Sequence, residues 1–508
     1  MNKSYANKYV KKILQADVYE VAEQTPLESA DNLSDRLANR ILFKREDLQP
    51  VFSFKLRGAY NKIRRLTETE RKAGVITASA GNHAQGVALA ARKLGIKAVI
   101  VMGKNTPEIK VDAVRRLGAQ VVLFGDSYDD ATDHANQLVK DKGYVYVHAF
   151  DDVDVIAGQG TIGMEILRQQ PGNLDAVFVP VGGGGLIGGI GAYIKYLRPE
   201  VKIIGVEAEG SACMSAALAA GRRVTLKADE IDQFADGTAV RQVGMENFRL
   251  ARETVDEVLT VSIDEICAGI KDIFEDTRSI SEPSGALAVA GIKQYITRTG
   301  LRDQTYVAIL SGANMNFDRL RHISERTEIG EKREVLLSVA IPEQQGSFRK
   351  FCSVVGKRNI TEFNYRYASQ DGAQVLVGVQ TRVDSADRND FLKKLQKNYE
   401  VVDLSDNEVA VLHVRHMVGG PVKGLINERL FRFEFPEQPG ALMKFLNVLG
   451  NFNISMFHYR NHGSAYGRVL VGIQIPNNSM GNFRRGLDKI GYRFWEETDN
   501  PAYQLFLR

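Results

Sequence analysis

The stretch Ser53-Phe54-Lys55-Leu56-Arg57-Gly58-Ala59 places one lysine between two bulky apolar residues, with an arginine two positions later. Partial removal from water and a neighbouring cation both disfavour the charged form of an amine. Helical spacing of apolar and small residues up to Leu66 predicts a helix that begins at Lys55, and its dipole would act in the same direction. The pattern is typical of a lysine that forms a Schiff base, although most single lysines are solvated surface charges.

The chain around this lysine reads as alternating helices and strands. Upstream, the pattern predicts a helix from Tyr9 to Val21, a helix around Leu33 to Leu37, and a strand from Ile41 to Lys44. Downstream, short continuous apolar runs suit strands that are buried on both faces of a parallel sheet. These runs are Val75–Thr77, Ala98–Val101, Val121–Leu123, Ala176–Val179, Ile203–Val206 and Val307–Leu310. An α/β architecture is therefore expected through about residue 325.

Four successive glycines, Gly182 to Gly185, follow one of these predicted strands and precede an apolar helix. Such a turn lets backbone N–H groups converge on a phosphate at a helix N-terminus. A flexible loop is the alternative interpretation. The turn matches neither the Walker A pattern nor GxGxxG, which disfavours ATP and dinucleotides. An imine-forming lysine together with a cup for one phosphate suggests pyridoxal phosphate.

Five motifs, taken together and in order, resemble those of the threonine dehydratases. They are Ser53-Phe54-Lys55-x-Arg57-Gly58-Ala59, Ser79-x-Gly81-Asn82-His83-Ala84-Gln85-Gly86, Gly182-Gly183-Gly184-Gly185-Leu186, Glu282-Pro283-x-Gly285-Ala286 and Ser311-Gly312-Ala313-Asn314. The resemblance spans roughly residues 17–330. It implies a fold type II pyridoxal-phosphate enzyme of the tryptophan-synthase β-like class.

The resemblance also implies a role for each matching residue. Lys55 would hold the cofactor as a Schiff base and act as the catalytic base, and Phe54 would lie against the ring. Asn82 would hydrogen-bond the pyridine 3-oxygen, and Ser311 would face the pyridine nitrogen. Two further sets are implied: the phosphate cup consists of Gly182, Gly183, Gly184, Gly185 and Leu186, and the loop for the substrate carboxylate consists of Ser79, Ala80, Gly81, Asn82 and His83.

A neutral hydroxyl at Ser311 would make the cofactor ring a weaker electron sink than an acid would. A carbanion at Cα should then expel a β-leaving group rapidly, which favours β-elimination. The expected reaction converts L-threonine to 2-oxobutanoate and ammonia, with Lys55 taking the α-proton and with the cofactor phosphate or a nearby group protonating the leaving hydroxyl. Serine is the expected secondary substrate.

Composition limits the alternatives. The 508 residues predict three or four domains, and 66 basic against 62 acidic residues indicate neither nucleic acid nor an anionic membrane as a partner. No signal peptide or membrane span is recognised, and the three cysteines form no CxxC pair, so a cytoplasmic location is expected. Relatives such as the serine racemases bind a cation near a glutamate that resembles Glu207. Because Cys213 stands where they carry an aspartate, no metal is expected here.

The chain beyond Arg326 contains an internal repeat. Residues 339–380 align without gaps on residues 433–474, with identity at 18 of the 42 positions. Each copy, about 75 residues long, reads as strand, glycine turn, helix, strand, strand, helix, strand. The copies resemble the ACT-like domains of biosynthetic threonine dehydratases, which are ferredoxin-like α+β modules.

The resemblance implies the following organisation. Residues 1–328 form the catalytic region, with a smaller subdomain at roughly 56–155; residues 334–406 form the first ACT-like domain; residues 407–427 are a linker; residues 428–500 form the second ACT-like domain, with a C-terminal strand to 508. This tail implies a role in isoleucine biosynthesis, isoleucine as inhibitor, valine as antagonist and a homotetramer. The expected effector residues are Gly346, Phe348, Gly440 and Leu442.

Two other classes of function would share parts of this pattern. A β-replacement enzyme, such as a cysteine synthase, would share the fold, but it would need a second nucleophile and release no oxoacid from threonine. A non-catalytic amino-acid sensor could keep the tail, but it would have little reason to retain Lys55, Asn82 and Ser311 together.

Overall fold

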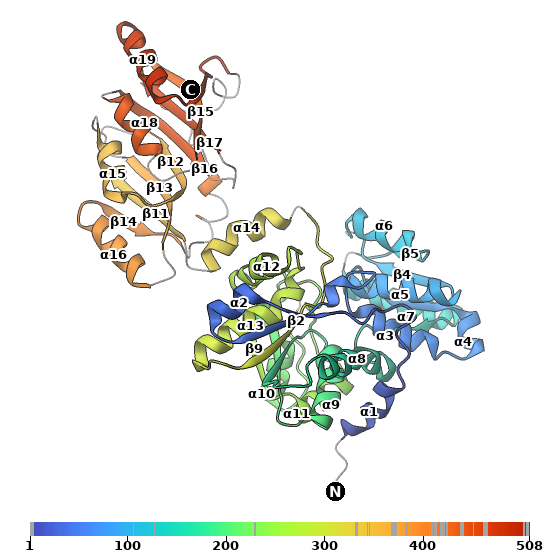
Figure 1. Ribbon diagram of the computed structural model, residues 1–508. Coiled ribbons are helices and arrows are strands. Elements are labelled where there is room, and N and C mark those ends of the chain that lie inside the picture. Colours follow the sequence, from blue (N-terminus) through green and yellow to red (C-terminus); the bar gives the residue numbers. More distant parts are fainter. Residues whose placement is uncertain are drawn as a thin grey trace. The chain divides into compact units, whose positions relative to one another are not determined.

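The protein, represented by a computed structural model, consists of two compact units, residues 1–327 and residues 328–508 (Figure 1). The structure describes residues 5–507 except 105, 126, 228–229, 318, 331–333, 343, 345, 367–372, 382–384, 406, 408–409, 411–413, 417–421, 423–424, 437–440, 451, 461–465, 501–502 and 504–506.

The first unit contains two sheets. The six-stranded sheet has the order β1-β2-β10-β7-β8-β9 and is parallel except for the antiparallel pair β1–β2. Its strands are β1 (Leu27–Ser29), β2 (Arg40–Lys44), β7 (Ala176–Pro180), β8 (Lys202–Ala208), β9 (Glu257–Val261) and β10 (Thr305–Ile309). The smaller, parallel sheet has the order β5-β4-β3-β6. Its strands are β3 (Val75–Ala78), β4 (Ala98–Met102), β5 (Gln120–Leu123) and β6 (Val145–Tyr146).

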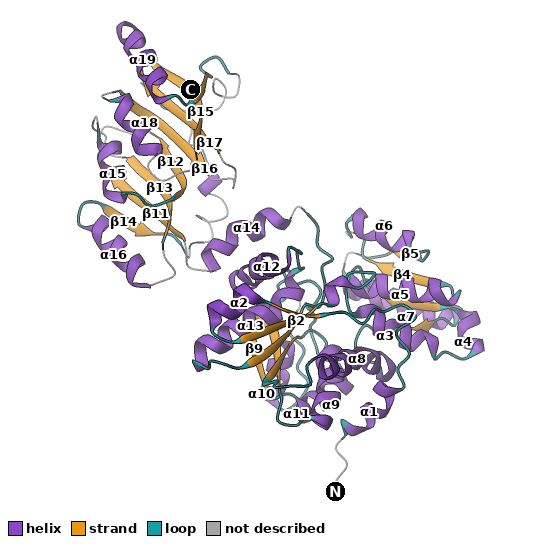
Figure 2. Ribbon diagram, in the orientation of Figure 1, coloured by secondary structure: helices purple, strands orange, loops and turns teal. Residues whose placement is uncertain are grey.

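Helices cover both faces of the six-stranded sheet (Figure 2). The helices of this unit are α1 (Asn7–Leu14), α2 (Asp31–Leu37), α3 (Lys55–Arg64), α4 (Glu68–Ala73), α5 (Asn82–Leu94), α6 (Glu108–Arg116), α7 (Tyr128–Lys142), α8 (Val153–Gln169), α9 (Gly185–Leu197), α10 (Cys213–Ala220), α11 (Met245–Thr254), α12 (Ile263–Thr277) and α13 (Pro283–Thr299), with 3₁₀ turns η1 (Glu46–Leu48) and η2 (Glu209–Ser211). α14 (Arg319–Gly330) spans the boundary between the units.

The apolar runs form strands because each side of the sheet has its own core. In β7, Ala176 and Phe178 join one buried cluster, whereas Val177 and Val179 join another. This alternation follows from the two-residue period of a strand. The sequence therefore predicted the parallel strands correctly. The predicted helix from Tyr9 to Val21 was too long, because α1 ends at Leu14 and the chain then turns.

The second unit is built on one eight-stranded antiparallel sheet of order β14-β11-β13-β12-β16-β17-β15-β18. The first copy supplies β11 (Glu334–Ile341), α15 (Ser347–Val355), β12 (Ile360–Arg366), β13 (Ala373–Gln380), α16 (Ser385–Gln396) and β14 (Glu400–Asp403). The second supplies β15 (Glu428–Pro436), α18 (Ala441–Leu449), β16 (Asn453–Arg460), β17 (Tyr466–Gln474), η5 (Asn477–Ser479), α19 (Met480–Ile490) and β18 (Arg493–Glu496). η4 (Val414–His416) lies between the copies.

Both copies have the predicted ferredoxin-like order, and β12 pairs with β16 to join them into one sheet. α15, α16, α18 and α19 lie along one face of that sheet (Figure 2). One hydrophobic core runs beneath both copies, with Phe348 and Phe351 from the first and Phe445 and Leu449 from the second. The two copies thus share a single core.

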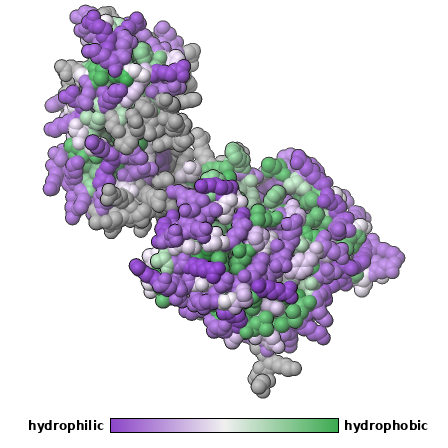
Figure 3. All heavy atoms as spheres, viewed as in Figure 1, coloured by the Kyte–Doolittle hydropathy of each residue, from purple (hydrophilic) through white to green (hydrophobic). Residues whose placement is uncertain are grey.

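The viewed surface of each unit is mainly hydrophilic, with smaller apolar areas between the polar ones (Figure 3). Within the described part of the chain, no helix combines the length and the apolar character needed to cross a membrane.

Candidate active site

The predicted site residues lie where strands of the first unit end. Asn82 begins α5 after β3, the turn Gly182 to Gly185 follows β7, and Ser311 follows β10. Ligands of open α/β sheets collect at these carboxyl ends. Lys55 is the first residue of α3, and its side chain extends into the same region.

The Lys55 amine is half-buried and donates a hydrogen bond to the carbonyl oxygen of Ala149 at 3.1 Å. It lies 5.4 Å from the centre of the Phe54 ring. Burial lowers the pKa of Lys55 to about 8, opposed in part by the charge of Glu282. The predicted contribution of Arg57 was wrong, because that guanidinium is paired with Glu46 and Glu165 instead of acting on the amine.

Asn82 is held by polar groups on both sides of its amide. Its Nδ2 donates to Oε1 of Glu282 at 2.7 Å, and its Oδ1 accepts from Nδ2 of Asn314 at 2.7 Å. An amide nitrogen carries two protons, so the second N–H of Asn82 can still serve a ligand oxygen. The orientation fits the predicted role toward the pyridine 3-oxygen.

Glu282 is the active-site residue for which sequence reasoning assigned no role, although its motif was recognised. The side chain is only 4% exposed. Burial raises the pKa of Glu282 to about 8, with Asp236 adding to the rise and the Asn82 amide opposing it. The neutral form of this carboxyl is therefore favoured below pH 8, and the group gains its negative charge as the pH rises through 8.

The predicted carboxylate loop, Ser79 to His83, forms the turn into α5. The Ser79 hydroxyl accepts a hydrogen bond from the Gly81 N–H at 3.3 Å. Donors at the start of a helix suit a carboxylate. His83 points elsewhere: its Nε2 lies 2.9 Å from the Val147 carbonyl oxygen, and burial lowers the pKa of this imidazole to about 3. His83 therefore remains neutral near pH 7 and contributes its backbone rather than a charge.

The glycine turn is too tightly packed for side chains. A Cβ atom on Gly183 would overlap the Phe150 ring, and one on Gly182 would lie 2.9 Å from the backbone of Thr238. Gly184 has φ +92°, a conformation that L side chains rarely adopt. Gly185 and Leu186 are the first two residues of α9. The N–H groups of the first turn of a helix have no partner within the helix, so those of α9 point out of its N-terminus at the glycine turn.

Ser311 lies beside the lysine stretch. Its carbonyl accepts the Phe54 N–H at 3.3 Å, and Ser53 and Gly312 form an isolated antiparallel bridge. The Ser311 hydroxyl donates to the Ser284 carbonyl at 3.4 Å, a long contact that leaves it available to a better acceptor. Lys55, Phe54 and Ser311 are thus neighbours.

These groups fit pyridoxal phosphate. The structure provides an amine of lowered pKa, a glycine turn that is packed too tightly for side chains and leads into the N-terminus of α9, an oriented amide and a neutral hydroxyl. Ala149 accepts from Lys55, and the next residue, Phe150, packs on the glycine turn. The lysine and the phosphate cradle are therefore adjacent. The two residues that join them carried no sequence signal.

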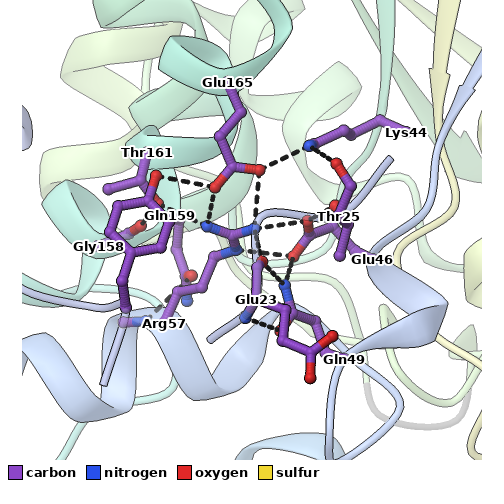
Figure 4. Close-up of polar contacts among 12 residues, drawn as sticks. Glu23, Thr25, Lys44, Glu46, Gln49, Arg57, Gly158, Gln159, Thr161 and Glu165 are labelled. Atoms are coloured by element: carbon purple, nitrogen blue, oxygen red, sulfur yellow. Dashed lines mark hydrogen bonds and ion pairs between the residues drawn. The ribbon is translucent and has the colours of Figure 1, made fainter. Parts of the chain in front are cut away.

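A buried charge cluster surrounds Arg57, two positions after Lys55 (Figure 4). The Arg57 guanidinium donates to both oxygens of Glu46 at 2.8 Å and to the two oxygens of Glu165 at 2.6 and 3.1 Å. Lys44 donates to Glu165 at 2.6 Å and to the Thr25 carbonyl at 2.6 Å. All four charged side chains are fully buried. Their two positive and two negative charges balance.

The Glu207 side chain binds two backbone N–H groups of the protein. Its two carboxylate oxygens accept the N–H groups of Met214 and Ser215, each at 2.8 Å, at the start of α10. The thiol of Cys213 lies 3.7 Å from the Gly182 carbonyl. Among the described residues, no group of three or more histidine, cysteine, aspartate or glutamate side chains could hold a metal ion.

A pocket in the second unit lies between the copies. Gly346 and the first two residues of α15, Ser347 and Phe348, line one side, and Leu446 and Leu449 at the end of α18 line the other. The expected effector residues Gly346 and Phe348 therefore line a pocket. The expected effector residue Leu442 is the second residue of α18 and packs against the core, and Gly440 lies outside the described residues.

Comparison with known proteins agrees with this geometry. Residues 18–312 match the family model for pyridoxal-phosphate dependent enzymes, and residues 325–414 and 420–507 match the C-terminal regulatory domain of threonine dehydratase. The chain is 55% identical to a biosynthetic L-threonine dehydratase of Burkholderia multivorans, over 98% of this chain and 99% of the relative. It is 50% identical to the chloroplastic biosynthetic threonine dehydratase of Arabidopsis thaliana, over 99% of this chain and 84% of the relative.

A solved structure shows the same fold. The processed form of threonine deaminase isoform 2 from Solanum lycopersicum matches with a TM-score of 0.62 and 50% identity, over 63% of this chain and 93% of that one. The fold and the site thus define a pyridoxal-phosphate-dependent enzyme of fold type II, followed by two ACT-like regulatory domains. Within that class, the chain belongs to the biosynthetic threonine dehydratase family.

Proposed function

We propose that the protein converts L-threonine to 2-oxobutanoate and ammonia by α,β-elimination, as the first step of isoleucine biosynthesis. The observation that carries this proposal is the adjacency of the Lys55 amine and the glycine turn through Ala149 and Phe150. The family membership supports the same reaction. Serine is the expected secondary substrate, and the cytoplasm the expected location.

Each residue has a task in this proposal. Pyridoxal phosphate, when bound, supplies an electron sink for negative charge at the Cα of an attached amino acid. The backbone donors of the Ser79 to His83 turn bind the substrate carboxylate. In its free, neutral form the Lys55 amine would take the α-proton, because its pKa of about 8 makes the neutral form accessible near pH 7.

The remaining site residues control orientation and charge. Asn82, fixed between Glu282 and Asn314, presents one N–H to the 3-oxygen of the cofactor. Ser311 offers an uncharged hydroxyl to the pyridine nitrogen, so the site favours rapid loss of the β-hydroxyl. Gly182 to Leu186 hold the phosphate with backbone N–H groups.

Replacing the lysine tests the reaction. We expect Lys55→Ala to fold, to lose the visible imine absorbance and to lose 2-oxobutanoate formation by about four orders of magnitude, because base and Schiff base disappear together. Matched thermal unfolding of the two proteins controls for the fold. Turnover retained by the variant would refute the assignment. Formation of a β-substituted amino acid, without oxoacid, only when a second nucleophile is supplied would indicate a β-replacement enzyme.

The tail is proposed to inhibit the enzyme when isoleucine binds, with valine as antagonist. The pocket beside Gly346 and Phe348 combines apolar walls with a helix N-terminus, which suits a small apolar amino acid and its carboxylate. Coupling between the sites should be about 1–3 kcal/mol. A homotetramer is the expected assembly.

Ending the chain after Thr327, the last residue of the first unit, tests this regulation. We expect the shortened enzyme to form 2-oxobutanoate from threonine and to ignore isoleucine, whereas the full chain is inhibited. Inhibition that persists after the cut would place the effector site in the first unit.

A further inference from the structure

Helix α8 touches both helices that carry the cofactor-binding ends of the site. On one side it crosses α3, which begins at Lys55; on the other it crosses α9, which begins at the glycine turn. Both crossings are made by glycines, so backbone lies directly against backbone. The separation of α3 and α9 therefore depends on one element.

The crossing with α3 is fixed by Gly58 and Gly158. A Cβ atom on Gly158 would lie 2.7 Å from both the Arg57 carbonyl oxygen and the Gly58 Cα. The Gly58 N–H donates to Oε1 of Gln159 at 3.2 Å. The Arg57 cluster strengthens this crossing, because Glu165 belongs to α8 and binds both Arg57 and Lys44 (Figure 4).

The crossing with α9 is fixed by Gly160 and Gly189. A Cβ atom on Gly189 would lie 2.5 Å from the Ile156 carbonyl oxygen and 2.7 Å from the Gly160 nitrogen. Gly163 continues the contact more loosely, since its Cβ atom would lie 3.3 Å from the Ile190 backbone. Backbone atoms cannot rotate away as side chains do, so a methyl group here must move a helix.

Both crossings lie close to the working ends. Gly58 follows Lys55 by three positions, and Gly189 follows Gly185 by four, which corresponds to about one helical turn in each case. A shift at either crossing is therefore passed almost directly to the amine or to the glycine turn.

We infer that α8 is a spacer that sets the distance between the Lys55 amine and the glycine turn, with Gly158 and Gly189 as its positioning residues. This inference rests on the proposed site. Pyridoxal phosphate can span only a limited range of distances between its aldehyde and its phosphate, because both are joined to one rigid ring through few bonds. Binding of both ends at once gains a large effective concentration, which is lost when the geometry no longer matches.

The test compares two aldehydes on the cofactor-free full-length enzyme. Pyridoxal forms an imine with Lys55 without using the phosphate cradle, whereas pyridoxal phosphate uses both ends. The quantity measured is the ratio of the Kd of pyridoxal to that of pyridoxal phosphate, from imine absorbance. We expect Gly158→Ala and Gly189→Ala to lower this ratio at least tenfold, while the Kd of pyridoxal changes less than threefold.

Two further variants keep the inference falsifiable. Gly163→Ala has the milder contact and should fold readily, and it should lower the ratio about two- to threefold. Gly291→Ala is the matched control, because its Cβ atom would overlap the Val206 side chain in another part of the same unit. It should lower the Tm and leave the ratio unchanged.

The outcomes separate the spacer from the site. A proportional change in both dissociation constants, an unchanged ratio in all three α8 variants, or an equal fall in Gly291→Ala would overturn the spacer. A parent enzyme that does not prefer pyridoxal phosphate to pyridoxal, or a Lys55→Ala variant that keeps the imine band, would overturn the site itself.

Discussion

Glu46 and Glu282 are both buried carboxyl groups of the first unit, yet their surroundings differ. Burial acts to raise the pKa of Glu46, but the charge and hydrogen bonds of Arg57 outweigh it and hold this pKa below its ordinary value. Glu282 receives an amide instead of a cation, and burial raises its pKa to about 8. The difference shows that one buried carboxyl is held ionised by the guanidinium of Arg57, whereas the other, whose charge acts on Lys55, is bound by an amide and favours its neutral form.

Removing the Arg57 guanidinium, which pairs with Glu46, should have the largest effect on stability. Arg57→Met leaves two buried carboxyl groups with Lys44 alone, so we expect the free energy of unfolding of the first unit to fall by about 3–5 kcal/mol. Urea unfolding of the cofactor-free protein measures this. Arg298→Met is the matched control, because its pair with Glu257 is exposed and should contribute less than about 1 kcal/mol. Equal losses in both variants would erase the contrast between buried and exposed pairs.

The contribution of Glu282 to the stability of the protein should depend on pH. Its pKa is about 8 in the folded protein and 4.5 otherwise, so the folded state keeps a proton that the unfolded state releases. The stability from this group is therefore full below pH 4.5 and is lost as pH rises through 8. Relative to Glu282→Gln, the cofactor-free parent should lose up to about 1.4 kcal/mol per pH unit in this window. Parallel stability curves would show that the carboxyl is ionised throughout.

The smallest expected effect is a shift in the Lys55 titration. Imine formation with pyridoxal should rise with pH around a midpoint near 8 instead of 10.5, because burial disfavours the ammonium form. Glu282→Gln should move the midpoint lower, since the Glu282 charge favours the protonated amine. Stopped-flow absorbance over a pH series measures both midpoints. A rise in the midpoint after the substitution would contradict the electrostatic effect of Glu282 on Lys55.

The sequence alone was enough to predict those residues whose chemical role few other residue types could fill. A glycine turn after an apolar strand, and a lysine at a helix start, are visible as local patterns, and the structure brings the two together through Ala149 and Phe150. The role of Arg57 was misread, because a neighbour in sequence was taken for a neighbour in space. Its partners, Glu46 and Glu165, lie 11 and 108 residues away.

Other features depend on contacts that no local pattern encodes. The glycines of α8 matter because α3 and α9 cross there, and sequence periodicity shows a helix without showing its neighbours. The repeat was recognised from identity between copies, but the pairing of β12 with β16 depends on which strands are left at an edge once each copy has folded. Long-range packing of this kind needs the structure.

The β12–β16 pairing has a consequence for the behaviour of the duplicated tail. A copy on its own would present one of these strands as an open edge, and unpaired edge strands recruit strands from other molecules. Two copies in one chain satisfy each other's edges at high local concentration. Duplication therefore removes two open strand edges that would favour aggregation. Separating the copies would expose β12 and β16 to pairing with strands of other molecules.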